Sequence, residues 1–183
     1  MHLDRGLISP YFATDKEKMI CEMENPFILL TDKKITNIGQ ILKILEYAAK
    51  DVRPLFIIAD DVEGEVLSTL IINKDQGRIK VCVIKAPGFG DKRLEILKDI
   101  AVFTNSQVIT DETGERLEDV EVAFGVIGSA KRILVSKSST TIVDGAGDKA
   151  DIAARINFID SQILETDSEY EKENLQARVE QLL

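Results

Sequence analysis

Short apolar runs alternate with helical patterns in the first part of the chain. The strand-like runs lie at 26–30, 55–59, 79–85 and 108–109. The stretches with apolar residues at helical spacing lie at 41–50, 65–74 and 93–103. Such alternation is typical of an α/β fold with a parallel sheet covered by helices.

The pattern changes towards the C-terminus. The apolar runs at 132–135 and 140–143 are separated by four residues, which predicts an antiparallel hairpin and therefore a mixed sheet. Two further helical stretches carry Ile152, Ile156, Ile159 and Ile163, and then Leu175, Val179 and Leu182. Thr166 and Glu169 match a capping box between them. We therefore expect a C-terminal helical hairpin at 146–183.

The stretch 38–50 has more apolar surface than a core contact needs. Its apolar residues cover an arc of about 160°, whereas a core-facing stripe needs roughly 100°. They are Ile38, Ile41, Leu42, Ile44, Leu45, Ala48 and Ala49. Asn37, with Gln40 three residues later, is expected to cap the start of this helix.

The stretch 65–74 shows the same excess in another form. Val66 and Leu70 form one ridge, Leu67 and Ile71 form a second ridge about 100° around the helix, and Ile72 extends the apolar surface further. One ridge can face the sheet, so the other must meet something else. Two interpretations stay open: a helix enclosed by neighbouring elements, or an exposed apolar groove between two helices.

Composition narrows the possible functions. The 183 residues carry a formal charge of −9 and show no basic cluster, which disfavours nucleic-acid binding. No apolar run approaches the roughly 18 residues of a membrane span, and the N-terminus lacks a signal-peptide pattern. Cys21 and Cys82 lie far apart, and we interpret them as two buried thiols of a cytoplasmic protein. The single histidine, His2, disfavours zinc sites and histidine-based triads.

The alternation of strands and helices also raises a nucleotide-binding hypothesis. A dinucleotide fold needs G-x-G-x-x-G after its first strand, but residues 31–35 contain no glycine, and no P-loop is present. The acidic run 60–65 allows a metal site, although carboxylates at the start of a helix also complement the helix dipole. Neither feature indicates a catalytic residue or a bound metal.

Five segments resemble a known family in sequence and in order. They are DRGLISPYF at 4–12, PFILLTDKKI at 26–35, PLFIIADDVEGE at 54–65, KAPGFGD at 85–91 and TTIVDG at 140–145. Together they resemble the apical domain of group I (GroEL-type) chaperonins over 1–183. Three departures fit a divergent paralogue: Leu7 replaces a usual tyrosine, Asn105 and Ser106 stand where Gly-Gly is common, and 116–129 match weakly.

The resemblance implies a chaperone domain that binds unfolded or misfolded polypeptides, and the mobile loop of a GroES-type co-chaperonin, in an apolar groove between two helices. It also implies that Arg5 contacts a neighbouring subunit and that Asn73 is a polar groove position. The implied polypeptide-binding residues are Leu7, Tyr11, Phe12, Leu42, Leu45, Leu67, Ile71 and Ile72. The implied co-chaperonin contacts are Leu42, Leu45, Leu67, Ile71 and Ile72.

The parent implied by the resemblance is an ATP-driven cage of two heptameric rings in the cytoplasm. Its ATP and magnesium sites belong to an equatorial domain whose Gly-Asp-Gly-Thr-Thr motif is absent from this sequence. We therefore expect these residues to form a monomer that has no cofactor and hydrolyses nothing. Two rival hypotheses remain: a nucleotide-dependent enzyme, and a structural ring spacer whose apolar helices are covered by neighbours.

Overall fold

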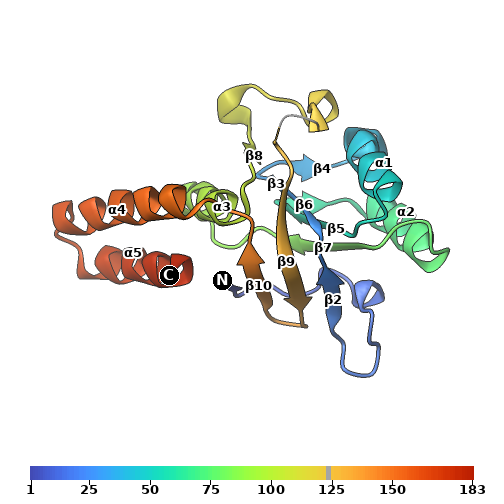
Figure 1. The fold of residues 1–183 in the computed structure, drawn as a ribbon, viewed down its shortest axis with the longest axis horizontal. Coiled ribbons are helices and arrows are strands. Elements are labelled where there is room, and N and C mark those ends of the chain that lie inside the picture. The colour runs from blue at the N-terminus through green and yellow to red at the C-terminus, as the bar shows by residue number, and fades with distance from the viewer. Residues whose placement is uncertain (123–124) are drawn as a thin grey trace.

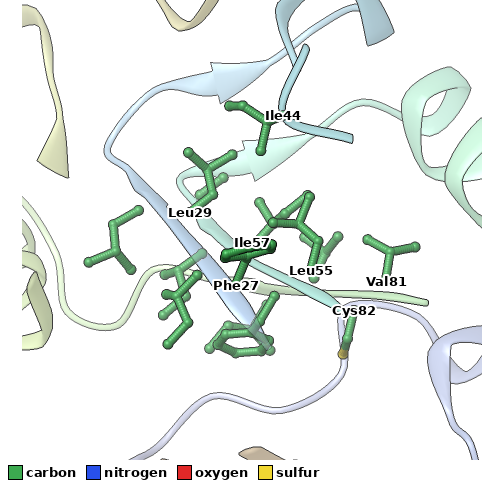
Figure 2. Packing of buried hydrophobic residues seen from close by; sticks show 14 of the residues in the cluster. Phe27, Leu29, Ile44, Leu55, Ile57, Val81 and Cys82 are labelled. Atoms are coloured by element: carbon green, nitrogen blue, oxygen red, sulfur yellow. The ribbon is translucent and has the colours of Figure 1, made fainter. Parts of the chain in front are cut away.

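A mixed β-sheet organises the fold in the computed structural model, which describes residues 1–122 and 125–183 (Figure 1). Its parallel part has the strand order β8-β3-β5-β7. The strands are β3 (Phe27–Thr31), β5 (Leu55–Ala59), β7 (Val81–Lys85) and β8 (Val108–Ile109). Every residue of β3 and β5 is buried, as expected for parallel strands covered on both faces (Figure 2).

Three helices connect the parallel strands. They are α1 (Leu42–Lys50) between β3 and β5, α2 (Gly64–Asp75) between β5 and β7, and α3 (Asp91–Thr104) between β7 and β8. Because crossovers between parallel strands are right-handed, α1 and α2 lie on the same face of the sheet. The chain returns from β7 to β8 across the sheet, so α3 covers the opposite face and contacts β3, β8 and β9.

An antiparallel part extends the sheet. It contains β1 (His2–Leu3), β2 (Cys21–Glu24), β9 (Gly128–Val135) and β10 (Thr140–Gly145). One edge of β9 pairs with β10, while the other edge pairs first with β3 and then with β2. The predicted hairpin is confirmed, with Thr140 opposite Val135, and β9 joins the two parts of the sheet.

Short 3₁₀ turns lie at several junctions. They are η1 (Pro10–Phe12), η2 (Ile38–Gln40), η3 (Asp111–Thr113) and η4 (Leu117–Asp119). The helix expected over 38–50 therefore begins as η2, and α1 starts at Leu42. Asn37 precedes this turn as predicted, and its backbone N–H donates to Gln40 Oε1 at 3.1 Å.

The C-terminal helices α4 (Lys149–Glu165) and α5 (Glu169–Leu182) pack against each other and extend to one side of the sheets (Figure 1). Ile159, Leu175 and Leu182 form a small apolar core of their own. The predicted cap at Thr166 is wrong: Ser168 is the N-cap, and its hydroxyl accepts from Glu171 N–H at 3.2 Å. The Thr166 hydroxyl donates instead to the Glu171 carboxylate at 2.8 Å, because the connecting residues stay extended up to Ser168.

A buried ionic network attaches this hairpin to α3. The carboxylate of Asp99 is almost fully buried and accepts from Arg155 Nε at 2.8 Å and from Arg178 Nε at 2.7 Å. Glu95 Oε2 accepts from Arg155 Nη2 at 2.9 Å. A buried carboxylate is tolerated here because two guanidinium groups neutralise and hydrogen-bond it.

Within the described parts of the chain, none of the helices combines the length and the apolar composition that crossing a membrane requires.

Candidate functional site

Helix α2 buries one apolar ridge and leaves the other partly open. Val66 and Leu70 are buried, so theirs is the one of the two predicted ridges that faces the core. Leu67 and Ile71 are half-buried, and Ile72 is 54% exposed. The second ridge therefore rests on the edge of the core while keeping part of its apolar surface in solvent.

Helix α1 divides its apolar arc in the same way. Ile44 and Ala48 are buried, whereas Leu45 is half-buried and Leu42 is 47% exposed. The apolar residues in excess of a core-facing stripe, Leu42 and Leu45, therefore lie on the side of α1 that is open to solvent. Leu42, Leu45, Leu67, Ile71 and Ile72 are called the helix-pair surface below.

A short parallel ladder holds the starts of the two helices together. The strands β4 (Lys34–Ile35) and β6 (Asp61–Val62) precede α1 and α2 and pair with each other. The Glu63 N–H also donates to the Ile35 carbonyl at 2.9 Å. Because both helices then run back over neighbouring strands of one sheet, they lie next to each other (Figure 1).

The N-terminal segment adds Tyr11 to the border of the helix-pair surface. Tyr11 is 61% exposed on η1, and η1 contacts α2. The Ser9 hydroxyl caps this turn by accepting from Tyr11 N–H at 3.3 Å. Lys74, near the end of α2, donates from Nζ to the Ala13 carbonyl at 3.5 Å and links the two elements.

Phe12 was expected to bind polypeptide, and the structure corrects this assignment. Its side chain is 0% exposed, so it belongs to the core and not to an open surface. Successive residues in a 3₁₀ turn point about 120° apart. The turn that exposes Tyr11 therefore directs Phe12 inward, and we remove Phe12 from the candidate site.

The contacts of Leu7 and Arg5 are made with other segments. Leu7 is half-buried, and its N–H donates to the Ser136 carbonyl at 2.9 Å, in the turn between β9 and β10. The Arg5 guanidinium lies 5.5 Å from the centre of the Phe89 ring, which is largely exposed. Within the described residues, neither of them shares a hydrogen bond or a cation–π contact with Leu42, Leu45 or the α2 ridge.

Asn73 uses its side chain within its own neighbourhood. Its amide Nδ2 donates to the Thr69 carbonyl at 2.8 Å, and its Oδ1 accepts from Arg78 at 3.4 Å. The amide is half-buried beside Ile72. A ligand that used Asn73 would have to share or replace these hydrogen bonds.

The acidic run before α2 is paired with basic side chains. Asp60 binds the Arg93 guanidinium, Asp61 lies 3.6 Å from Lys85 Nζ, and Glu63 lies 3.9 Å from Lys34 Nζ. Over residues 1–122 and 125–183, no group of three or more His, Cys, Asp or Glu side chains is placed to hold a metal ion.

The carboxyl ends of β3 and β8 mark the position where a doubly wound sheet usually binds a nucleotide. Here Asp32 Oδ2 accepts from the Thr110 hydroxyl at 2.7 Å. The neighbouring Lys33 ammonium lies 3.0 Å from Asp111 and also donates to the Glu115 carbonyl. A carboxylate at this position, together with a lysine already paired, opposes phosphate binding.

Two hollows in the protein surface lie away from the helix pair. One, of about 440 Å³, lies between α3 and α4 and is lined by residues that include Ser106 and Phe158. The other, of about 260 Å³, lies around residues 114–126. The residues of the helix-pair surface line neither of these hollows.

Comparison with protein families gives no assignment. No family model matches the chain. What the site does must therefore be inferred from its residues, their exposure and the sequence resemblance.

Proposed function

We propose that this chain is a polypeptide-binding domain of the GroEL-type chaperonin kind and that the helix-pair surface holds apolar segments of unfolded proteins. The observation that carries the proposal is the partial exposure of the ridge formed by Leu67 and Ile71. A ridge needed only for stability would be buried as completely as Val66 and Leu70 are.

Burial of apolar surface supplies the binding energy in this proposal. Each Å² of apolar surface removed from water contributes about 25 cal/mol. Several leucine-sized contacts can therefore support roughly micromolar affinity once ordering costs are subtracted. Such attraction has no directional requirement, so we expect low sequence specificity and a preference for apolar segments.

The wider assignment belongs to the same proposal. The mobile loop of a GroES-type co-chaperonin would use the same five residues, and Arg5 would contact a neighbouring subunit in a heptameric double ring in the cytoplasm. ATP-driven movement of the parent would then exchange bound polypeptide for the co-chaperonin. Neither ATP nor magnesium would bind to these residues.

The double substitution Leu67→Ser with Ile71→Ser tests the proposal. It replaces the two apolar side chains of the open ridge with serine side chains and leaves Val66 and Leu70 in the core. We expect at least a tenfold rise in Kd for a reduced, carboxymethylated protein that cannot refold, because two apolar contacts are lost. Fluorescence anisotropy measures the Kd, and far-UV circular dichroism verifies that the variant is folded.

Phe158→Ser with Leu164→Ser is the matched control. Both side chains are exposed on α4, so the variant removes at least as much exposed apolar surface outside the helix pair. Its Kd should equal that of the unchanged protein. The proposal is refuted if the α2 variant binds normally or if both variants lose binding equally. A structural spacer would be distinguished in the intact ring, where a fluorescent probe of exposed apolar surface would give little signal because neighbouring subunits cover the helices.

A further inference from the structure

The hollow of about 440 Å³ lies where the end of α3 meets the start of α4, and it is called the α3–α4 hollow below. Four residues within 101–106 line it on the α3 side. On the α4 side it is lined by one face of the helix, where Asp151, Ala154, Arg155 and Phe158 recur at helical spacing. Its volume is sufficient for a small organic molecule.

The uncompensated charge at this hollow is negative. Asp151 and Arg155 are four residues apart, a spacing at which an ion pair usually forms along a helix. The Arg155 guanidinium instead turns to α3, where Nε lies 2.8 Å from Asp99 and Nη2 lies 2.9 Å from Glu95. Asp151 is exposed and has neither an ion pair nor a side-chain hydrogen bond within residues 1–122 and 125–183. Its carboxylate is therefore left for a cation.

The Ser106 hydroxyl can only accept a hydrogen bond from a molecule in the hollow. The Thr104 hydroxyl donates its single hydrogen to the Ile100 carbonyl at 2.7 Å. Because Thr104 Oγ1 also lies 2.6 Å from Ser106 Oγ, the hydrogen of this second bond comes from Ser106. The oxygen of Ser106 then keeps only lone pairs. A molecule that contacts both Ser106 and Asp151 must therefore be a hydrogen-bond donor.

The polar lining on the α3 side comes from a departure in the sequence. Asn105 and Ser106 stand where the resembled family commonly has Gly-Gly, which would provide no side-chain groups. Asn105 follows α3 with φ of 58°, is exposed, and makes no side-chain hydrogen bond within the part of the chain that the structure describes. Its amide oxygen is available as a further acceptor. This lining thus belongs to this sequence and does not follow from the resemblance.

Phe158 supplies an apolar surface at the other end of the hollow. It lies seven residues after Asp151, which places both on one face of α4 about 10 Å apart along its axis. The Phe158 side chain is 47% exposed, and the Arg155 guanidinium lies 5.3 Å from its ring centre. The small side chains of Ala101 and Ala154 also line the hollow and leave room for a ligand. The shape favours an elongated molecule with a cation at one end and an apolar group at the other.

We propose that the α3–α4 hollow binds small organic ammonium ions that carry an apolar group. The ammonium donates to the Asp151 carboxylate and to the oxygen atoms of Ser106 and Asn105, while the apolar group contacts Phe158. One exposed ion pair and one partly buried apolar group support a Kd of about 1 mM.

Three probes of similar size test the requirement for a positive charge. Phenethylammonium, phenethyl alcohol and hydrocinnamate share a phenyl ring on a short chain and end in a cation, a neutral hydroxyl and an anion. Amide chemical shifts in nuclear magnetic resonance spectra report where each probe binds and with what Kd. We expect phenethylammonium to shift amides of 101–106 and 151–158, the alcohol to bind about fivefold more weakly, and hydrocinnamate not to bind.

The proposal is overturned if the alcohol or hydrocinnamate binds as tightly as phenethylammonium. It is also overturned if the shifts caused by phenethylammonium lie outside these two ranges or do not saturate. These outcomes come from the unchanged protein, so they do not depend on the folding of a variant.

Asp151→Asn separates a specific contact from the general attraction of cations to an acidic protein. We expect it to raise the Kd of phenethylammonium about fivefold and to leave that of the alcohol unchanged. Asp160→Asn is the matched control, because Asp160 is also exposed on α4 but does not line the hollow. The control removes the same charge and should not change the Kd. Equal effects of the two variants would contradict the proposal.

Asn105→Gly tests the acceptor on the α3 side. Glycine suits the left-handed backbone at this position, so the variant should fold normally. We expect it to raise the Kd of phenethylammonium about twofold, and an unchanged Kd would count against the proposed contacts. No polypeptide enters these experiments, so their outcome is independent of the proposed function. Loss of binding to unfolded protein in Leu67→Ser with Ile71→Ser should leave the Kd of phenethylammonium unchanged.

Discussion

At the residue scale, Val52 has a backbone conformation that does not suit its side chain. It follows α1 with φ of 54°, in the left-handed region, and 89% of its surface is exposed. Helices often end in this conformation, but usually with glycine, because a Cβ atom is strained there and a β-branched side chain more so. The residue therefore weakens the end of α1 without any gain in packing.

Val52→Gly should stabilise the protein. Relief of the left-handed strain exceeds the entropy that glycine adds to the unfolded chain, and we expect a net gain of about 0.5–1 kcal/mol in the free energy of unfolding. Urea denaturation measures the change. Val52→Ala is the control, since it removes the branch but keeps the Cβ, and it should gain less. Equal stability of the two variants would contradict the role of strain.

Tyr11 and Phe12 are adjacent aromatic residues, but Tyr11 is exposed and Phe12 is buried. The sequence indicates two aromatic residues in irregular chain, but it does not give the rotation of the turn. Only η1, which begins at Pro10 and packs against β7 and α2, directs one ring outward and the other into the core. Which of the two rings is exposed therefore depends on tertiary contacts.

At the element scale, the C-terminal hairpin is held by charge as well as by apolar contact. Its own core is small, and the Asp99 network with Arg155 and Arg178 joins it to α3. Burial alone would raise the pKa of Glu95, but the hydrogen bond and charge of Arg155, with Lys98, bring its pKa below the ordinary value of 4.5. The ionised form of Glu95 thus favours the docked hairpin.

The stability of the docked hairpin should depend on pH in the acidic range. Because the pKa of Glu95 is lowered in the folded state, its contribution is present above pH 4.5 and is lost as the pH falls through the lower, folded-state value. Glu95→Gln should therefore be less stable than the unchanged protein near neutral pH. The difference should disappear well below pH 4.5.

Hydrogen exchange of α4 and α5 amides, measured in both proteins across this range, tests the prediction. Lys98→Gln is a control. Lys98 Nζ lies 3.4 Å from Glu95 Oε1 and its other ion pair is with Glu112, so Lys98 does not bridge α3 to the hairpin. It should have a smaller effect. A constant difference between Glu95→Gln and the unchanged protein at every pH would contradict the role of the Glu95 charge.

The elements themselves were predictable to different degrees. The buried runs of β3, β5 and β7 were recognised, because strands covered on both faces are continuously apolar. The strands β1, β4 and β6 were not recognised, since each is two residues long and exists only through pairing with a distant partner. The strand β2 was also missed, although its sequence alternates apolar and charged residues, a pattern that matches its alternating burial and could have revealed it.

At the scale of the whole molecule, β9 joins the two parts of the sheet. Its first residues, Gly128 and Ser129, pair with β3, and the rest of the strand pairs with β2 and β10. A Cβ at Gly128 would lie 1.9 Å from Ser106 Oγ and 2.4 Å from the Thr104 carbonyl oxygen. The junction therefore requires a residue without a side chain.

Gly128→Ala should destabilise the whole protein by about 1–3 kcal/mol, because the junction must shift to admit a methyl group. Both parts of the sheet share one apolar cluster, so we expect the loss in a single unfolding transition. Chemical denaturation followed by circular dichroism measures it. Gly64→Ala is the control: its Cβ would meet no atom within 4 Å, at the start of α2. Similar losses in both variants would contradict the steric explanation.

Local patterns in the sequence predicted the longer strands and helices and the surplus of apolar surface. Periodicity shows that α2 has two apolar ridges, of which a sheet can cover one, and the structure shows that Val66 and Leu70 form the covered ridge. Spacing along one helix reports only angles around that helix. It therefore identified Leu67 and Ile71 as a second ridge without showing how far that ridge would be exposed.

Which distant residues lie together depends on tertiary packing. The pairing of β4 with β6 brings α1 beside α2, and the turn of η1 buries Phe12. The physical reason is the same in each case. These contacts join residues distant in the chain, and their geometry depends on strand order and packing, which no local pattern of apolar and polar residues contains.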